Sequence, residues 1–413
     1  MSEFLSLVRR NRNYRFTWLG QVVSEIGDHF NNVAVYALVI QTTSSGLAVS
    51  GVLLARAIPA VLAGPVAGVV LDRLDRRRTM IASDLVRAVV AALFVLTVTH
   101  PRLWLLYVLS AILMFASPFF TAGRAAILPS ITSEGELHAA NSLTQTTQWA
   151  TQVVGAIVAG YAVAWFGYSA AFLLNAVSFL LSAGAIWALR RDGGFRTVRA
   201  QAGPALRPWS DYRDGLLYIW RTPLILGIGL ISVGWAAGGG AAQILFVLFA
   251  EQVFHRGAQG IGALSGFAGI GLLIGGVAGH LMGRRVGFAG YKHTVSAAYV
   301  SHGLAYVLFS LTPNYGLALA MMAVSRVGMA VTSVLNYFQL LKHTPDEYRG
   351  RVFATMESLR WSTMMLSFAV AGIASNRFTP REIGVVAGLL GGVTGVLWAV
   401  ANWRGRLPEP NER

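Results

Sequence analysis

Apolar residues along this chain gather into long runs, and short polar segments separate the runs. Each run holds about 20 residues or more, the length that an α-helix needs to cross the hydrocarbon core of a bilayer. The pattern predicts an all-α integral membrane protein with twelve transmembrane helices. The predicted spans are residues 15–41, 49–71, 79–99, 103–127, 139–166, 169–190, 222–250, 258–283, 293–312, 315–341, 352–376 and 382–403.

One polar segment is much longer than the others and divides the spans into two sets of six. It covers residues 192–216, and its Gly, Pro and charged residues are typical of a cytoplasmic linker. We therefore expect an N-terminal six-helix bundle over residues 1–191 and a C-terminal six-helix bundle over residues 217–413. Glycine recurs every four residues in segments 258–283 and 382–403, which favours close packing between helices.

Composition supports a membrane protein, and the placement of charge predicts its orientation. Apolar residues make up 55% of the chain and charged residues 12%, against about 25% charged residues in soluble domains. Of the 33 Lys and Arg, 24 lie at the termini and in one set of alternate loops, four lie in the other loops, and five lie within spans. The positive-inside rule then places both termini in the cytoplasm of a protein that crosses the inner (plasma) membrane many times.

The net charge of +15 raises the question of a nucleic-acid partner. Because the basic residues follow the loops, they reflect topology and contact with anionic lipid headgroups. We expect membrane lipids and no nucleic acid as partners.

The sequence lacks the motifs that several kinds of chemistry require. The chain has no Cys, which excludes disulfides and thiol chemistry. It has no GxxxxGK[ST] loop for ATP hydrolysis and no His pair at metal-ligand spacing. The stretch GFAGIGLLIGG (266–276) lies inside a span with no strand before it, so it is a poor dinucleotide motif. We expect no cofactor, no metal and no enzymatic activity.

The first span carries a polar stripe. At 100° per residue, its polar side chains fall within an arc of about 100°. They are Gln21, Glu25, Asp28, His29, Asn32 and Tyr36. Ionisable residues inside a membrane are costly, so such a stripe is expected to line a cavity.

Glu25 and Asp28 lie near the membrane midplane, one helical turn apart. Two carboxylates so close in a medium of low dielectric cannot both be ionised at low cost, so one can take up and release a proton. We assign Glu25, Asp28 and His29 to proton coupling. The alternative is a structural ion pair, for which Arg56 in the second span is the candidate partner of Asp28.

The C-terminal half has its own candidates for a substrate cavity. Glu357 and Arg360 are spaced i, i+3 on one helix and are expected to pair. The sequence identifies no partner for Arg326, which leaves two interpretations: an interhelical ion pair, or contact with an anionic group of a substrate.

The remaining cavity candidates come from both halves of the chain. They are Gln21, Asn32, Tyr36, Arg56, Gln243, Asn336, Tyr337, Trp149, Trp235 and Trp361.

The two halves contain an internal repeat. GVVLDRLDRRRTM (68–80) in the first half corresponds to GHLMGRRVGFAGY (279–291) in the second. Both begin with Gly at the end of an apolar run and then become basic. Parallel six-helix halves are typical of secondary transporters, whose substrate site lies near the midplane.

GVVLDRLDRRR (68–78) resembles the loop between helices 2 and 3 of the major facilitator superfamily, apart from Asp75, where many members have Gly. ARAIPAVLAGP (55–65), SDLVRA (83–88) and TPDEYRGRV (344–352) resemble the branch that holds macrolide-type drug exporters and the enterobactin exporter. The resemblance covers nearly the whole chain. It implies two pseudo-symmetric six-helix bundles and alternating access.

The resemblance also implies a cytoplasmic gate, because in the family this loop holds the cytoplasmic side shut in the outward-facing state. The matching positions are Gly68, where backbones approach closely, with Asp72, Arg73 and Arg76, and the pair Asp84 and Arg87 one turn apart on the next helix. The alternative is a solvated basic loop that only sets topology.

Together these features predict a secondary active transporter, a proton-coupled exporter of amphiphilic small molecules (a drug/H⁺ antiporter). Its expected partners are a small-molecule substrate, protons and membrane lipids, and we expect a monomer. Two alternatives keep the fold: a siderophore exporter and a lysophospholipid flippase. An alternative of another class is a non-transporting membrane receptor.

Overall fold

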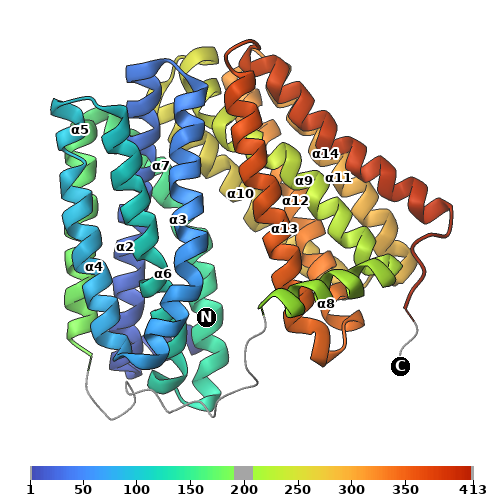
Figure 1. Cartoon of the computed structure of the whole chain (residues 1–413), viewed down its shortest axis with the longest axis horizontal. Coiled ribbons are helices and arrows are strands. Elements are labelled where there is room, and N and C mark those ends of the chain that lie inside the picture. Colours follow the sequence, from blue (N-terminus) through green and yellow to red (C-terminus); the bar gives the residue numbers. More distant parts are fainter. Residues whose placement is uncertain (1, 190–207, 411–413) are drawn as a thin grey trace. The chain divides into compact units, whose positions relative to one another are not determined.

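The computed structural model describes residues 2–189 and 208–410, and this part of the chain consists of helices joined by short turns (Figure 1). The N-terminal half contains α1 (Ser2–Arg10), α2 (Arg12–Thr43), α3 (Gly46–Arg73), α4 (Arg76–Leu93), α5 (Leu96–Thr99), α6 (Leu103–Ile131) and α7 (Glu134–Trp187). The C-terminal half contains α8 (Pro208–Arg221), α9 (Pro223–Leu248) with a π-helical continuation over Phe249–Val253, α10 (Gly257–Gly283), α11 (Phe288–Leu311), α12 (Tyr315–His343), α13 (Asp346–Ala374) and α14 (Pro380–Trp403).

The predicted spans fall on these helices, and α7 holds two of them. Its break is at Gly167, whose φ of 79° lies in the left-handed region that favours glycine. The sequence predicts this interruption between residues 166 and 169. Of the predicted linker, residues 192–207 lie outside the described residues, and residues 208–216 belong to α8.

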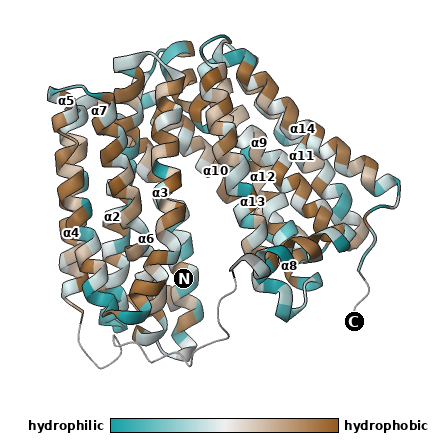
Figure 2. Ribbon diagram, in the orientation of Figure 1, coloured by the Kyte–Doolittle hydropathy of each residue, from teal (hydrophilic) through white to brown (hydrophobic). Residues whose placement is uncertain are grey.

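The described helices have the hydropathy that a bilayer requires. Nine of them are long and apolar enough to cross a membrane, and one of these, Gly135–Trp187, has 53 residues and supplies two crossings. α2 and α13 have 32 and 29 residues but carry the polar and acidic side chains considered below. Figure 2 shows hydrophobic residues along the lengths of the helices and hydrophilic residues mainly near their ends.

Two compact units divide the described chain. The first contains the described residues of Met1–Gly203 and His255–Gly266, and the second contains those of Pro204–Phe254 and Phe267–Arg413. In the first unit, α2 packs along α7, α3 along α6, and α4 against both α6 and α7. In the second unit, α11 packs along α12 and α14, and α9 packs along α13 and α14.

The glycine rows predicted to favour close packing do so in the second unit. A Cβ at Gly271 of α10 would lie 2.2 Å from the carbonyl oxygen of Ala323 in α12. A Cβ at Gly303 of α11 would lie 2.4 Å from the backbone nitrogen of Gly392 in α14. These helices therefore touch backbone to backbone, which only glycine permits.

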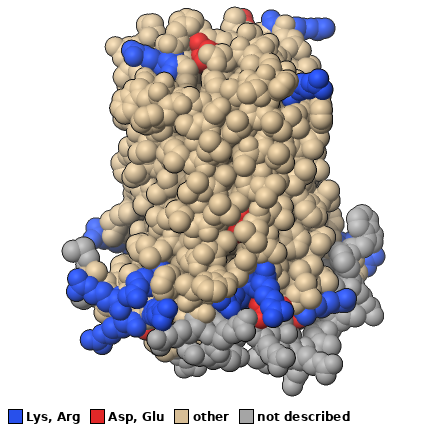
Figure 3. Space-filling model, turned by 90° about the vertical axis from the view of Figure 1, so that its left-hand side faces the viewer, with Lys and Arg blue, Asp and Glu red and all other residues tan. Residues whose placement is uncertain are grey.

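Basic side chains of the α3–α4 turn tie the ends of the first unit's helices together. Arg76 Nη1 donates to the carbonyl of Ala126 at 2.8 Å, and Arg77 Nε donates to that of Ile186 at 3.0 Å. Asp75, which departs from the family's usual glycine, caps α4 by accepting a hydrogen bond from the backbone N–H of Arg78 at 2.8 Å. On the face that Figure 3 shows, most Lys and Arg side chains gather at one end of the helices, and a few lie at the other end. A wide band without Lys or Arg separates the two groups.

Candidate functional site

Glu25 lies in a polar network between α2, α6 and α7 of the first unit. Its Oε1 accepts a hydrogen bond from Gln21 Nε2 at 2.9 Å, and its Oε2 accepts one from Thr151 Oγ1 at 2.7 Å. Arg124 of α6 forms an ion pair with it, with 3.5 Å between Nη1 and Oε1, and the two side chains are only 11% and 20% exposed. Glu25 therefore has a counter-ion and two donors of its own.

Asp28, one turn further along α2, has no comparable partner. Its Oδ1 is buried and accepts no hydrogen bond from the described residues. The charged groups that surround it are Arg87, Arg56, Glu25 and Asp84. A buried carboxylate oxygen without a donor is costly, so Asp28 is the less stabilised of the two acids in the stripe.

His29 lies against α7. A Cβ at Gly155 would be 2.7 Å from His29 Cδ2, so the missing side chain of this glycine makes room for the imidazole ring. The stripe on α2 thus meets α7 at both Glu25 and His29.

Arg56 of α3 is buried and contacts α2 through amide oxygens. Its Nη1 donates to Asn31 Oδ1 at 3.4 Å, and its Nη2 donates to Asn32 Oδ1. The guanidinium also lies 5.8 Å from the centroid of the Tyr36 ring, a cation–π contact. The structure therefore brings Asn32, Tyr36 and Arg56 together. In the described part of the chain, Arg56 pairs with these groups and not with Asp28. Its guanidinium meets α2 at Asn31 and Asn32, about one helical turn beyond Asp28.

Asp84 and Arg87 form an ion pair inside the first unit, with side chains that are 0% and 2% exposed. The Arg87 guanidinium lies 4.7 Å from the ring centroid of Phe120 in α6 and 4.3 Å from that of Phe179 in α7. This pair joins α4 to two neighbouring helices, and no contact among the described residues links it to the α3–α4 turn.

The other gate candidates lie around the α3–α4 turn. Asp72 and Arg73 are exposed at the end of α3, and Arg76 is partly buried. α3 continues to Arg73, so Gly68 lies inside the helix and does not end it. Within the first unit, no atom would lie within 4 Å of a Cβ at Gly68.

The second unit contains a partly polar cavity of about 310 Å³ between α9, α11, α12 and α13. Five of the predicted cavity residues line it: Trp235, Asn336, Tyr337, Glu357 and Arg360. The expected ion pair is present: Arg360 Nε donates to Glu357 Oε2 at 3.0 Å. An ion pair among aromatic walls suits a ligand with both polar and apolar parts.

Some of the predicted residues make further hydrogen bonds, and others lie outside the cavity lining. Asn336 also accepts a hydrogen bond from the Tyr291 hydroxyl at 2.9 Å, and Trp361 Nε1 donates to Glu357 at 2.8 Å. Gln243 and Trp149 are exposed. Arg326 is buried in α12 outside the residues that line the cavity.

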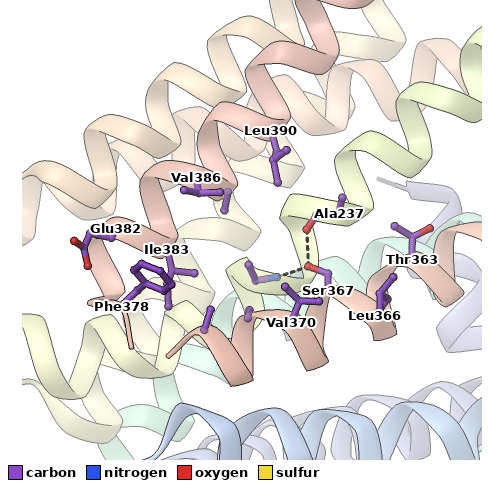
Figure 4. A pocket seen from close by; sticks show the side chains of 14 residues that line it. Ala237, Thr363, Leu366, Ser367, Val370, Phe378, Glu382, Ile383, Val386 and Leu390 are labelled. Atoms are coloured by element: carbon purple, nitrogen blue, oxygen red, sulfur yellow. Dashed lines mark hydrogen bonds between the residues drawn. The ribbon is translucent and has the colours of Figure 1, made fainter. Parts of the chain in front are cut away.

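A second hollow of the same unit is almost entirely apolar. It has a volume of about 390 Å³ and lies between α9, α13 and α14. Figure 4 shows Leu366 and Val370 of α13 and Val386 and Leu390 of α14 around it. The Ser367 hydroxyl is satisfied by the backbone of α9, so it adds no free polar group. Such a surface suits an alkyl chain.

Comparison with known proteins identifies the family to which this chain belongs. The profile of the Major Facilitator Superfamily matches residues 17–367. The chain belongs to this superfamily.

Drug exporters are among the relatives of this superfamily member. The multidrug efflux pump Tap of Mycolicibacterium fortuitum is 27% identical over 356 residues, which cover 84% of this chain and 85% of that protein. Macrolide efflux protein A of Streptococcus pyogenes is 23% identical over 375 residues, 89% of each chain. The predicted resemblance to the drug-exporter branch is confirmed.

A solved structure of the nucleoside transporter NupG has a TM-score of 0.71 at 12% identity, covering 94% of this chain and 98% of that one. This similarity supports the superfamily's fold alone. The predicted fold class is confirmed, and the chain is a multi-pass membrane transporter and not an enzyme.

Sequence reasoning missed two polar residues of the superfamily member's first unit. Arg124 is the counter-ion of Glu25, and Asn31 shares the Arg56 guanidinium with Asn32. The available signal for Arg124 was its place inside a predicted span, where a buried arginine needs a partner. Nothing in the sequence identified which acid that partner is.

Proposed function

We propose that this transporter exports amphiphilic small molecules in exchange for protons, across the plasma membrane and with both termini in the cytoplasm. The observation that carries the proposal is the unequal environment of the two acids on α2. Glu25 has Arg124, Thr151 and Gln21 as partners, whereas the buried Oδ1 of Asp28 accepts no hydrogen bond from the described residues.

Asp28 is the proton carrier in this mechanism, and Glu25 stays paired with Arg124. A protonated Asp28 is neutral and can remain buried, whereas the ionised form requires compensation from Arg87 or Arg56, the cations near it. Glu25 and Asp84 are the other acids in its surroundings, and each is paired with its own arginine. A proton that enters from outside neutralises Asp28, and its release to the cytoplasm completes the cycle.

Asp72, Arg73 and Arg76 close the cytoplasmic side in the proposed cycle, near the position where Gly68 allows close approach. Asp84 and Arg87 contribute from within the first unit by holding α4 on α6 and α7 beside Asp28. The concentration of Lys and Arg at one end of the helices supports a cytoplasmic location for that end.

The substrate class follows from the second unit. Its cavity combines the Glu357–Arg360 ion pair and Asn336 with the rings of Trp235 and Tyr337. Amphiphilic molecules with a cationic group fit this combination, because the Glu357 carboxylate and the faces of the aromatic rings both attract cations. Efflux of multiple drugs and of macrolides by the two relatives supports the same class.

A second candidate keeps the fold and changes the cargo to an anionic amphiphile, a siderophore or a lysophospholipid. Arg360 in the cavity and the apolar hollow between α13 and α14 favour it, since they suit an anionic group and an alkyl chain. A receptor would bind either class without moving it.

The test is flux in proteoliposomes under an imposed pH gradient, with lipophilic cations, siderophores and lysolipids offered in parallel. We expect gradient-driven flux of the cations and its loss, by about 100-fold or to background, in Asp28→Asn. Glu409→Gln is the matched control, because this exposed acid forms an ion pair with Lys342 at the protein surface.

The outcomes of this test distinguish the proposed function from its alternatives. If Asp28→Asn and Glu25→Gln both transport normally, the coupling assignment is wrong. If only lysolipids or siderophores move, the anionic cargo replaces the cationic one. Binding without flux identifies a receptor.

A further inference from the structure

We propose that the second unit holds a small monovalent anion, chloride under ordinary ionic conditions, between the guanidinium of Arg326 and the hydroxyl of Tyr306. Neither residue is among those that line the cavity around Glu357. It does not depend on the cargo or on the direction of transport.

Arg326 is a buried cation without a counter-ion in the described part of the chain. Its side chain lies in α12 and the residue is 6% exposed. Nη1 faces only the sulfur of Met329 at 3.7 Å, and the guanidinium lies 5.4 Å from the ring centroid of Phe246 in α9. A thioether is a weak acceptor and a ring carries no net charge. These contacts leave most of the five N–H donors and the whole positive charge uncompensated.

Two helices of the second unit besides α12 lie against this side chain. Phe246 belongs to α9, and Gly271 of α10 lies against the base of the arginine, where an added Cβ would be 2.8 Å from Arg326 Cβ. The close approach of α10 covers the base of the Arg326 side chain. An isolated charge that is buried is costly, so a compensating charge is expected.

Tyr306 of α11 provides a second unsatisfied donor near the arginine. The residue is 2% exposed, and its hydroxyl has no hydrogen-bond partner among the described residues. Its ring centroid lies 6.4 Å from that of His302, whose Nδ1 contacts Ser325, the residue before Arg326. A buried O–H without an acceptor is destabilising, and an anion would supply the missing acceptor.

His302 completes the polar surroundings without supplying a negative charge. Its Nδ1 lies 2.8 Å from both the carbonyl oxygen and Oγ of Ser325, the residue before Arg326. Helices α11 and α12 thus bring together a guanidinium, a free hydroxyl and an imidazole already bonded to the backbone. No acid among the described residues is within ion-pair distance of Arg326.

A compact anion matches this set of groups. A halide accepts several hydrogen bonds without a directional requirement, so it can pair with the arginine and the tyrosine together. A carboxylate or phosphate of a cargo molecule has the same charge complementarity, but the 6% exposure of Arg326 leaves little access for a bulky group. An inorganic ion needs no such opening.

The test measures thermal unfolding of the purified full chain in detergent, with chloride replaced by gluconate at constant ionic strength. We expect chloride and bromide to raise the Tm by about 1–3 °C in a saturable manner. Tyr306→Phe keeps the ring and removes the hydroxyl, so half-saturation should need about tenfold more halide. Arg326→Gln should abolish the response. Arg326→Lys keeps the positive charge and should weaken the response, and it serves as the test if the glutamine variant does not fold.

Tyr291→Phe is the matched control. Tyr291 is a buried tyrosine of the same helix, but its hydroxyl already donates to Asn336 at 2.9 Å, so its halide response should equal that of the wild type. Crystals grown in bromide should show anomalous scattering between Arg326 and Tyr306.

Three results would overturn the proposal. They are no halide response in the wild type, an equal response in Tyr306→Phe and Tyr291→Phe, and stabilisation by acetate or phosphate esters with none by halides. The last result assigns the site to an anionic cargo group. None of these bears on proton coupling, which is measured as flux.

Discussion

At the scale of single residues, the charged groups inside the first unit are organised as separate pairs. Glu25 pairs with Arg124 and Asp84 pairs with Arg87, whereas Asp28 has no ion-pair partner among the described residues. Breaking a buried pair leaves one charge uncompensated, which costs more than the pair contributes. The pairs therefore fix which acid is available for proton exchange.

Loss of one member of the Glu25–Arg124 pair should show this cost. We expect Arg124→Met to lower the free energy of unfolding by about 3 kcal/mol. The double variant Glu25→Gln, Arg124→Met should recover part of that loss, because no carboxylate is left unpaired. Chemical or thermal unfolding in detergent measures the cycle. A double variant as unstable as the sum of the two single ones would show that the groups do not interact.

At the scale of helices, contact distance is set by glycine positions. α11 and α14 meet at Gly303, where an added Cβ would lie 2.4 Å from the backbone nitrogen of Gly392 and 2.6 Å from the carbonyl oxygen of Gly388. Backbone atoms cannot move aside as a flexible side chain can. The register of these two helices therefore depends on the absence of side chains.

Substitution of that glycine tests the packing. Gly303→Ala should lower the free energy of unfolding by about 2 kcal/mol, because the methyl group forces the helices apart. Gly276→Ala in α10 is the matched control, since a Cβ there meets nothing within 4 Å. We expect it to be neutral or slightly stabilising. Equal effects of the two substitutions on the unfolding midpoint would refute the contact.

At the scale of the whole molecule, the division into two units underlies the proposed alternating access. Each unit has its own polar features: the acids of α2 in the first, and the Glu357–Arg360 cavity with the buried Arg326 in the second. Proton coupling then requires that the protonation state of the first unit change the population of conformations. Substrate affinity in the second unit follows that population.

The gate prediction belongs to this scale. Asp72→Asn removes the charge proposed to hold the cytoplasmic side shut, so it should shift the population toward the inward-facing state. Spin labels at the cytoplasmic ends of the two units measure the distance distribution. Asp346→Asn controls for loss of an exposed acid, since it pairs locally with Arg349 at 2.6 Å. An unchanged distribution in Asp72→Asn would remove this residue from the gate.

The sequence by itself determined the number and order of the spans, the helix break near Gly167 and the membership of the superfamily. These depend on local hydropathy, on backbone freedom at glycine and on short motifs, all of which are written along the chain. It also placed Glu25, Asp28 and His29 on one helical stripe, because helix geometry is the same in every sequence.

The tertiary structure decided which charges meet. Asp28 and Arg56 have compatible depths on neighbouring helices, yet Arg56 binds Asn31 and Asn32, and Arg124 binds Glu25. Such pairings depend on the rotation and register of packed helices, which arise from side chains along their whole length. For the same reason, the association of the unpaired Arg326 with the unsatisfied Tyr306 became recognisable only once α11 and α12 were placed side by side.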